Sequence, residues 1–295
     1  MVPANILLIL VRWLDMKTRL KKTPSKKFQI FIAGTEKKKN WNLLSQEDVK
    51  NVLMSRIYIK KNKVKIEEFL SNFKKKPLMM LDPGAYTTHT QGIEINPVDY
   101  GNYALENEEF FDLCLNCDKI GNLETTLKNQ ILLEKMGLDV IPLFHYVEKK
   151  INNKNYWKIL KDYADSYGII ALGGSASVRS NVSIEWFKKC FSLASERNSL
   201  VHGCGMFSAE VLNMFPWWSC DSSNWLSFRG EVFIPQYNKL KRVNWREQGR
   251  LFLLSDFIED LGFDPSMLYD RRNRMRLNIR AFKWYESVKN NGSSW

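Results

Sequence analysis

Short apolar runs recur along the middle of the chain, and helical stretches lie between most of them. The runs that predict buried strands are FQIFIAG, PLMMLD, LCLNCDKIG, LDVIPLFH, GIIALGG, SLVHGCG and WWSCD, with a possible eighth at SRIYIK. The intervening helical stretches are LETTLKNQILLEKMG, NYWKILKDYADSYG, SIEWFKKCFSLASERN and SAEVLNMF. Strands that alternate with helices of this length form parallel βαβ units. The pattern therefore predicts an α/β protein with a (β/α)8 barrel of the TIM type.

The alternation ends near residue 235, which predicts a chain of two parts. Residues 1–235 would form the barrel with a lysine-rich N-terminal extension, and residues 236–295 a basic helical C-terminal segment. The apolar stretch ILLILVRWL near the start is interrupted by Arg12 and is too short to span a bilayer. Since no small-residue cleavage site follows it, we expect a packed helix there and no membrane partner.

The last predicted helix has an apolar face and a basic face. Its apolar face carries Met275, Ile279 and Phe282. Its basic face carries Arg272, Arg276, Arg280 and Lys283. This pattern leaves two interpretations open, a helix that contacts nucleic-acid phosphates and an ordinary packed helix with a solvated face.

The net charge indicates the kind of binding partner, and the cysteine content indicates the cellular compartment. The chain has 44 Lys and Arg against 32 Asp and Glu, a net charge of +12 that suits a polyanion such as nucleic acid and also promotes solubility. Lysine runs such as EKKKN are expected mostly to be solvated. Five irregularly spaced cysteines do not form a disulfide framework, which predicts a cytoplasmic protein, in the host cytoplasm if viral. Cys114 and Cys117 have CxxC spacing but lack a second pair, so we expect two partly buried thiols.

Polar or glycine residues stand at the carboxyl end of six successive predicted strands. They are Asp82, Asp118, His145, Gly173 with Gly174, His202 with Gly203, and Asp221. Active sites of barrels are built at this end of the strands. Turn preferences explain one such residue easily but explain six in succession poorly.

The sequence lacks the motifs of several common enzyme chemistries. The three histidines are isolated, with no HxH or HExxH pattern, and neither GxSxG nor GxGxxG occurs after a strand. We therefore expect no metal and no cofactor. Separated carboxylates suit glycosidic bond chemistry, and glycines allow the backbone to approach a planar base. Tyr86, Trp217 and Trp218 would wall such a pocket, although core packing also explains the two tryptophans.

Three segments carry a resemblance to a known family. LDPGAY, residues 81–86, resembles the DSGGF segment of the queuine-type tRNA-guanine transglycosylases, and ALGGSAS, residues 171–177, resembles their glycine-pair strand. VHGCGMFSAEVLNMFPWWSCDSS is similar to their nucleophile segment. The order of these segments, over about residues 77–225, is closest to the phage and bacterial branch, the 7-deazaguanine DNA transglycosylases.

The resemblance implies a role for each strand-end residue. Asp221 would be the nucleophile that attacks the sugar C1′, and Asp82 the carboxylate that handles protons. Asp118 would hydrogen-bond the purine edge, with backbone contacts from Gly173 and Gly174.

The remaining strand-end residues would complete the base pocket. His145 stands where the family has a base-reading glutamine. His202, Gly203 and Gly205 would shape the floor beneath the nucleophile.

One departure from the family bears on the substrate. The CxCxxC…H zinc site that follows the nucleophile in the tRNA enzymes is absent from this sequence. The resemblance therefore implies exchange of guanine in DNA for a 7-deazaguanine base as co-substrate, after the guanine has been flipped out of the duplex. The alternatives are the same exchange on tRNA, a plain glycosylase, and a nucleic-acid-binding barrel without catalysis.

Overall fold

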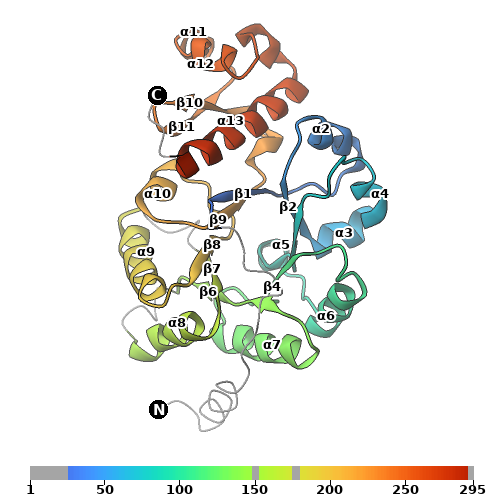
Figure 1. The fold of residues 1–295 in the computed structure, drawn as a ribbon, viewed down its shortest axis with the longest axis vertical. Coiled ribbons are helices and arrows are strands. Elements are labelled where there is room, and N and C mark those ends of the chain that lie inside the picture. The colour runs from blue at the N-terminus through green and yellow to red at the C-terminus, as the bar shows by residue number, and fades with distance from the viewer. Residues whose placement is uncertain (1–25, 148–152, 175–179, 292–295) are drawn as a thin grey trace. The chain divides into compact units, whose positions relative to one another are not determined.

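The computed structural model describes residues 26–147, 153–174 and 180–291 (Figure 1). These residues form two compact units. The first unit consists of residues 81–204, and the second of residues 27–80 together with residues 205–291. The helix expected at the N-terminus lies outside the described residues. No helix in the described ranges has both the length and the apolar character that crossing a membrane requires.

The first unit has parallel strands flanked by helices. Its strands are β4 (Leu113–Leu115), β5 (Val140–Ile141), β6 (Leu143–His145), β7 (Ile169–Gly173) and β8 (Leu200–Gly203). Its helices are α5 (Ala85–Gln91), α6 (Pro97–Glu106), α7 (Leu123–Lys135), α8 (Lys154–Ser166) and α9 (Ser180–Ser195). Strand β4 pairs with β5, and β7 pairs with both β6 and β8, in each case in parallel.

Pro142 divides one predicted strand into two. The run LDVIPLFH was expected to form one strand, whereas the structure has β5 before the proline and β6 after it. Proline lacks the N–H that a central strand donates to its neighbour, so the ladder is interrupted there. The Pro142 carbonyl still accepts a hydrogen bond from the Ala171 N–H, at 2.8 Å. The two halves then pair with different neighbours, β5 with β4 and β6 with β7.

The second unit combines parallel strands with an antiparallel hairpin. Its parallel strands are β1 (Gln29–Ile32), β2 (Asn51–Ser55), β9 (Ser219–Ser222) and most of β3 (Leu78–Asp82). Strand β1 pairs with β2 and with β9. Strands β10 (Glu231–Gln236) and β11 (Lys239–Asn244) form the hairpin.

Most helices of the second unit are short, and the last is the longest. The α-helices are α2 (Trp41–Gln46), α3 (Arg56–Asn62), α4 (Ile66–Leu70), α10 (Ala209–Met214), α11 (Gln248–Phe252), α12 (Ser255–Glu259) and α13 (Arg271–Asn291). The 3-10 turns are η1 (Lys38–Asn40), η3 (Asn224–Leu226) and η4 (Pro265–Tyr269).

Two local predictions for this unit are wrong. SRIYIK was expected to form a strand, but Ser55 ends β2 and the residues after it form α3. The buried run is Val52 to Ser55, whereas α3 buries Ile59 and exposes its lysines, as a helix on a surface does. The segment after residue 235 was expected to be helical, but it begins with the β10–β11 hairpin.

Helix α13 supplies much of the core of the second unit. Met275, Ile279 and Phe282 are buried, which confirms the predicted apolar face. The Phe282 ring lies 4.2 Å from the Phe207 ring. The Phe28 N–H, just before β1, donates to the Asn290 side chain at 2.6 Å, so the end of the helix is anchored beside β1.

The fold class is confirmed at the coarse level. The described residues are those of an α/β protein with nine parallel strands, where eight were predicted. The division of LDVIPLFH at Pro142 accounts for the additional strand.

Candidate functional site

The first unit brings two of the predicted site residues into direct contact. Asp118 follows β4 and His145 ends β6, and the His145 Nε2 lies 2.8 Å from the Asp118 Oδ2. Each side chain is only 4% exposed. A buried polar pair of this kind fixes the position of both groups and the orientation of the imidazole ring.

The backbone on both sides of this pair is held by hydrogen bonds with side chains. Beside Asp118, the Asn129 amide donates to the Cys117 carbonyl at 2.6 Å, and the Lys119 N–H donates to the Thr126 hydroxyl at 3.0 Å. The His145 carbonyl accepts a hydrogen bond from the Tyr156 hydroxyl. The loop after β4 and the end of β6 are therefore fixed relative to the strands.

Gly173 and Gly174 lie against His145 at the end of β7. A Cβ on Gly173 would approach the His145 Cδ2 to 2.9 Å, so any larger residue would push the imidazole out of place. Gly174 has a φ of +77°, which glycine adopts without strain. The sequence predicted that these glycines admit a planar base; the planar group found against Gly173 is the imidazole of His145. The Gly173 carbonyl accepts the Tyr146 N–H at 3.0 Å.

Asp82 and Asp118 both act electrostatically on the same buried thiol. Burial, together with the smaller effect of the charges of Asp118 and Asp82, raises the pKa of Cys117 to about 12. Tyr100 lies close by, since its hydroxyl donates to the Leu115 carbonyl at 2.7 Å. The first unit therefore gathers Asp82, Asp118 and His145 at the carboxyl ends of its strands.

The other predicted residues of the first unit have different environments. His202 is fully buried within β8, opposite Ala171 of β7, and Gly203 ends that strand. Tyr86, on the first turn of α5, is 70% exposed.

In the second unit, Asp221 lies in β9 with its carboxylate held by a backbone group. The Gly205 N–H donates to the Asp221 Oδ1 at 2.8 Å, and Asp221 is half-buried. The β9 backbone is fixed by pairing with β1, in which Asp221 lies opposite Phe31. An amide donor on one oxygen orients the carboxylate without neutralising it.

Trp217 and Trp218, just before β9, are core residues. Both are buried, and the Trp217 Nε1 donates to the Val211 carbonyl at 3.1 Å. This confirms packing, the simpler of their two interpretations.

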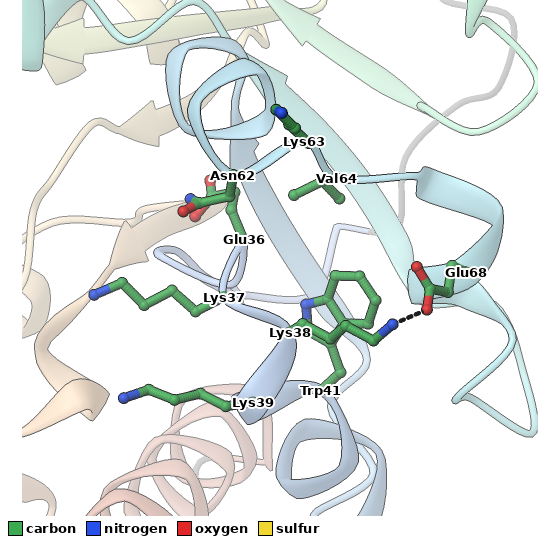
Figure 2. A pocket seen from close by; sticks show the side chains of 9 residues that line it. All are labelled: Glu36, Lys37, Lys38, Lys39, Trp41, Asn62, Lys63, Val64 and Glu68. Atoms are coloured by element: carbon green, nitrogen blue, oxygen red, sulfur yellow. Dashed lines mark hydrogen bonds and ion pairs between the residues drawn. The ribbon is translucent and has the colours of Figure 1, made fainter.

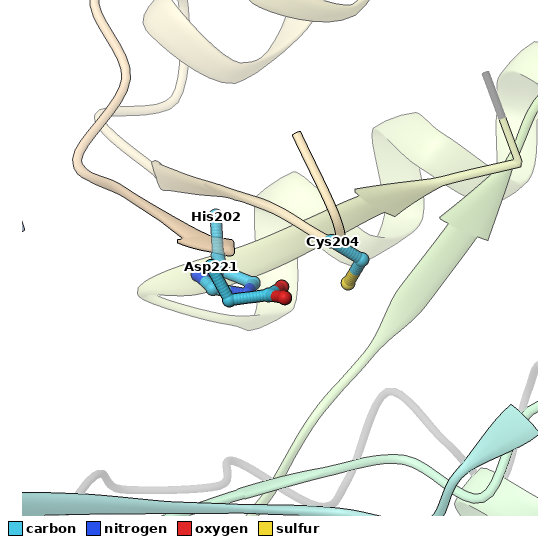
Figure 3. Close-up of side chains that lie close together, drawn as sticks. All are labelled: His202, Cys204 and Asp221. Atoms are coloured by element: carbon cyan, nitrogen blue, oxygen red, sulfur yellow. The ribbon is translucent and has the colours of Figure 1, made fainter. Parts of the chain in front are cut away.

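The cysteines and the residues at the ends of β8 and β9 carry donor atoms that can bind metals. Figure 3 shows His202, Cys204 and Asp221, each of which offers one donor atom of the types that bind transition metals. All five cysteines are free. Burial raises the pKa of Cys114 to about 12, as it does for Cys117, so the CxxC thiols are protonated at neutral pH. Protonated thiols are poor zinc ligands, in keeping with two buried thiols rather than a zinc knuckle.

Three of the four basic residues predicted on α13 are bound to one buried glutamate. Glu47, whose side chain is 5% exposed, receives Arg276 at 2.6 Å and Arg280 at 2.7 Å. Lys283 donates to the Glu47 carbonyl at 3.0 Å. Burial raises the pKa of Glu47, but the bonds from Arg280 and Arg276 outweigh burial and hold it below its ordinary value. Arg272, in contrast, is exposed at the start of the helix.

Sequence reasoning gave no functional role to the lysines that follow β1. Lys37 and Lys39 belong to the run EKKKN, which was expected to be solvated, and both line cavities of the second unit. The position of this run could have indicated a functional role, because the run comes directly after a predicted strand. No protein-family model matches the chain, and no curated protein sequence matches it.

Proposed function

We propose that this protein is a base-exchange transglycosylase, which replaces guanine in DNA by a 7-deazaguanine base through a covalent intermediate on Asp221. The observation that carries the proposal is the state of the Asp221 carboxylate. It is half-buried at a strand end, and the Gly205 N–H fixes one of its oxygens at 2.8 Å. A fixed carboxylate with access to solvent suits attack on an anomeric carbon.

The strand ends of the first unit support recognition of a purine. The Asp118–His145 pair is buried and rigid, and a purine edge is read by such fixed donors and acceptors. Asp82, half-buried at the end of β3, has the access to solvent that a proton-transferring carboxylate needs.

The proposed reaction consists of two displacements at one carbon. In the first, an Asp221 oxygen forms a bond to C1′ while the C1′–N9 bond breaks, and guanine leaves with that electron pair and takes up a proton from Asp82. In the second, the 7-deazaguanine base loses its N9 proton to Asp82 and attacks C1′, which releases Asp221. Two inversions give net retention at C1′.

The test compares substrates side by side. Duplex DNA and tRNA carrying labelled guanine are incubated with the protein and a 7-deazaguanine base, and release and incorporation are measured for each. We expect repeated release of guanine from DNA to depend on the added base, with at most one equivalent per protein released in its absence. Release from tRNA alone would establish the alternative substrate. Repeated release without the added base would establish a glycosylase, and DNA binding without any release would establish a protein that only binds.

A further inference from the structure

Two cavities of the second unit share the same lysines. The first cavity, of about 290 Å³, is lined by residues that include Glu36, Lys37, Lys38, Lys39, Trp41 and Lys63 (Figure 2). The second, of about 310 Å³, is lined by residues that include Lys37, Lys39, Phe228, Asp270, Arg271 and Arg272. Because Lys37 and Lys39 line both, the cavities adjoin, and we call their combined lining the basic surface.

Most cations of the basic surface have no carboxylate to neutralise them. Within the described ranges, Lys37, Lys39 and Lys63 have no ion pair, whereas Lys38 bonds to Glu68. Figure 2 shows Lys37 and Lys39 extending in the same direction, away from the Lys38–Glu68 pair. Unpaired lysines that point the same way favour an anionic ligand.

Besides Glu68, two acidic residues line these cavities, and both form hydrogen bonds elsewhere. Glu36 is only 3% exposed, and its carboxylate accepts the Ser55 N–H at 2.6 Å. Asp270 accepts the Arg272 N–H at 3.1 Å and the Asn273 N–H at 3.2 Å, as the cap of α13. Their hydrogen bonds are directed to the backbone and not to the lysines.

An exposed aromatic ring with a guanidinium over it completes the basic surface. Phe228 is 64% exposed, and the Arg271 guanidinium lies 5.0 Å from its ring centre. Arg271 is fixed by two hydrogen bonds to the Leu226 carbonyl, at 3.0 and 3.2 Å. An exposed aromatic ring beside cations is the arrangement on which nucleic-acid bases stack.

We infer that the basic surface binds the phosphodiester backbone of the DNA substrate, with Lys37 and Lys39 on successive phosphates and Phe228 against an unpaired base. The choice of DNA as ligand rests on the proposed function. Arg276 and Arg280 differ from these lysines because their charges are already matched by Glu47. The inference therefore places phosphate binding after β1 and at the start of α13, and not along the middle of that helix.

The experiment is a salt-dependent titration of a fluorescein-labelled DNA duplex that contains one unpaired guanine, followed by anisotropy. Lys37→Ala/Lys39→Ala is compared with Lys74→Ala/Lys75→Ala, which removes the same charge from exposed lysines of the same unit. The control pair comes just before β3, whose first residue bonds to the Lys50 carbonyl at the start of β2, so it lies at the opposite end of the strands. Thermal unfolding of each variant verifies that it is folded.

We expect the Lys37/Lys39 variant to bind roughly tenfold or more weakly at 0.1 M salt, with the slope of log K against log salt reduced by about 1.8. The Lys74/Lys75 control variant should have nearly the same affinity and the same slope as the wild type. Phe228→Ala should weaken binding on the order of tenfold without changing the slope. Equal losses for the two lysine pairs, or an unchanged slope, would overturn the inference.

Binding and exchange are measured separately so that the two proposals fail separately. If the Lys37/Lys39 variant loses binding but the wild-type protein releases no guanine, the basic surface stands and the proposed function does not. If guanine is released and the lysine variant binds and reacts like the wild type, the proposed function stands and the basic surface does not.

Discussion

Carboxyl groups near the strand ends of the two units have different environments. In the first unit, Asp118 is buried and bonded to the imidazole of His145 at 2.8 Å. In the second unit, Asp221 is half-buried and its Oδ1 accepts the Gly205 N–H, and Glu36 is buried against the Ser55 N–H. Burial without a cation raises the pKa of Glu36 to about 7.

The difference in burial and bonding indicates which role each carboxyl group is suited to. A buried carboxylate with a fixed partner keeps its position and serves recognition, because breaking the pair costs several kcal/mol. A half-buried carboxylate oriented by an amide donor keeps its access to solvent, which a nucleophile requires. The predictions below test this contrast, beginning with the largest expected effect.

Substitution of Asp221 should separate activity from stability. Asp221→Asn removes the proposed nucleophile and keeps an acceptor for the Gly205 N–H. We expect guanine exchange to fall by at least about a thousandfold, while the free energy of unfolding changes by less than about 0.5 kcal/mol. Exchange rates and urea denaturation give the two values. Exchange at the wild-type rate would remove Asp221 from the mechanism.

Substitution of Asp118 should cost stability as well as activity. Asp118→Ala leaves the buried His145 Nε2 without its acceptor, so we expect a loss of about 3 kcal/mol in the free energy of unfolding. Urea denaturation at pH 7 measures it. His145→Ala in the same background should add little further loss, because the pair is already broken. Additive losses would show that the two residues are not coupled.

Glu36 should make the second unit less stable as pH rises. Its pKa is about 7 in the folded state and near 4.5 when unfolded, so between these values the folded state binds more protons. The free energy of unfolding therefore falls as pH rises from about 4.5 to 7. Glu36→Gln does not titrate, and we expect it to be more stable than the wild type by about 3 kcal/mol at pH 8 and similar at pH 4.5.

Thermal unfolding across this pH range provides the measurement. Glu286 adds a parallel slope in both proteins, because burial raises its pKa to about 7 as well. The prediction concerns the difference between the two curves, and parallel curves would contradict it.

The arginines of α13 that bind Glu47 should contribute more to stability than the exposed Arg272 does. Glu47→Gln leaves Arg276 and Arg280 without their carboxylate, and both are about one third exposed. We expect a loss of about 1 to 2 kcal/mol in the free energy of unfolding, reduced by solvent screening of the arginines. Arg272→Ala, at the exposed start of the helix, should change stability by less than about 0.5 kcal/mol. Equal effects of the two substitutions in urea denaturation would refute this contrast.

Much of the fold could be predicted from the sequence because its strands are buried and regular. Seven apolar runs lie where strands form, and four helical stretches lie where helices form, because buried parallel strands read as continuous apolar runs. The same reading misplaced SRIYIK, since a short apolar run does not distinguish a strand from a surface helix. It also left LDVIPLFH undivided, although Pro142 marks the break.

The candidate site was predicted in part, because strand ends are readable and long-range pairs are not. The positions of Asp118 and His145 followed from the ends of their strands, but their hydrogen bond joins residues 27 positions apart. The pairing of Arg276 and Arg280 with Glu47 joins residues more than 200 positions apart, and no local pattern reveals it. For the same reason, the sequence did not distinguish these arginines from the unpaired Lys37 and Lys39.

The central claim is that Asp221 forms a covalent bond to the sugar of the substrate. The most direct measurement is mass spectrometry of the denatured, protease-digested protein after reaction with guanine-containing DNA in the absence of an incoming base. The account predicts a peptide carrying a deoxyribose-linked DNA fragment on Asp221, absent from the Asp221→Asn variant. A covalent fragment on another residue, or guanine release with no fragment on the protein, would contradict it.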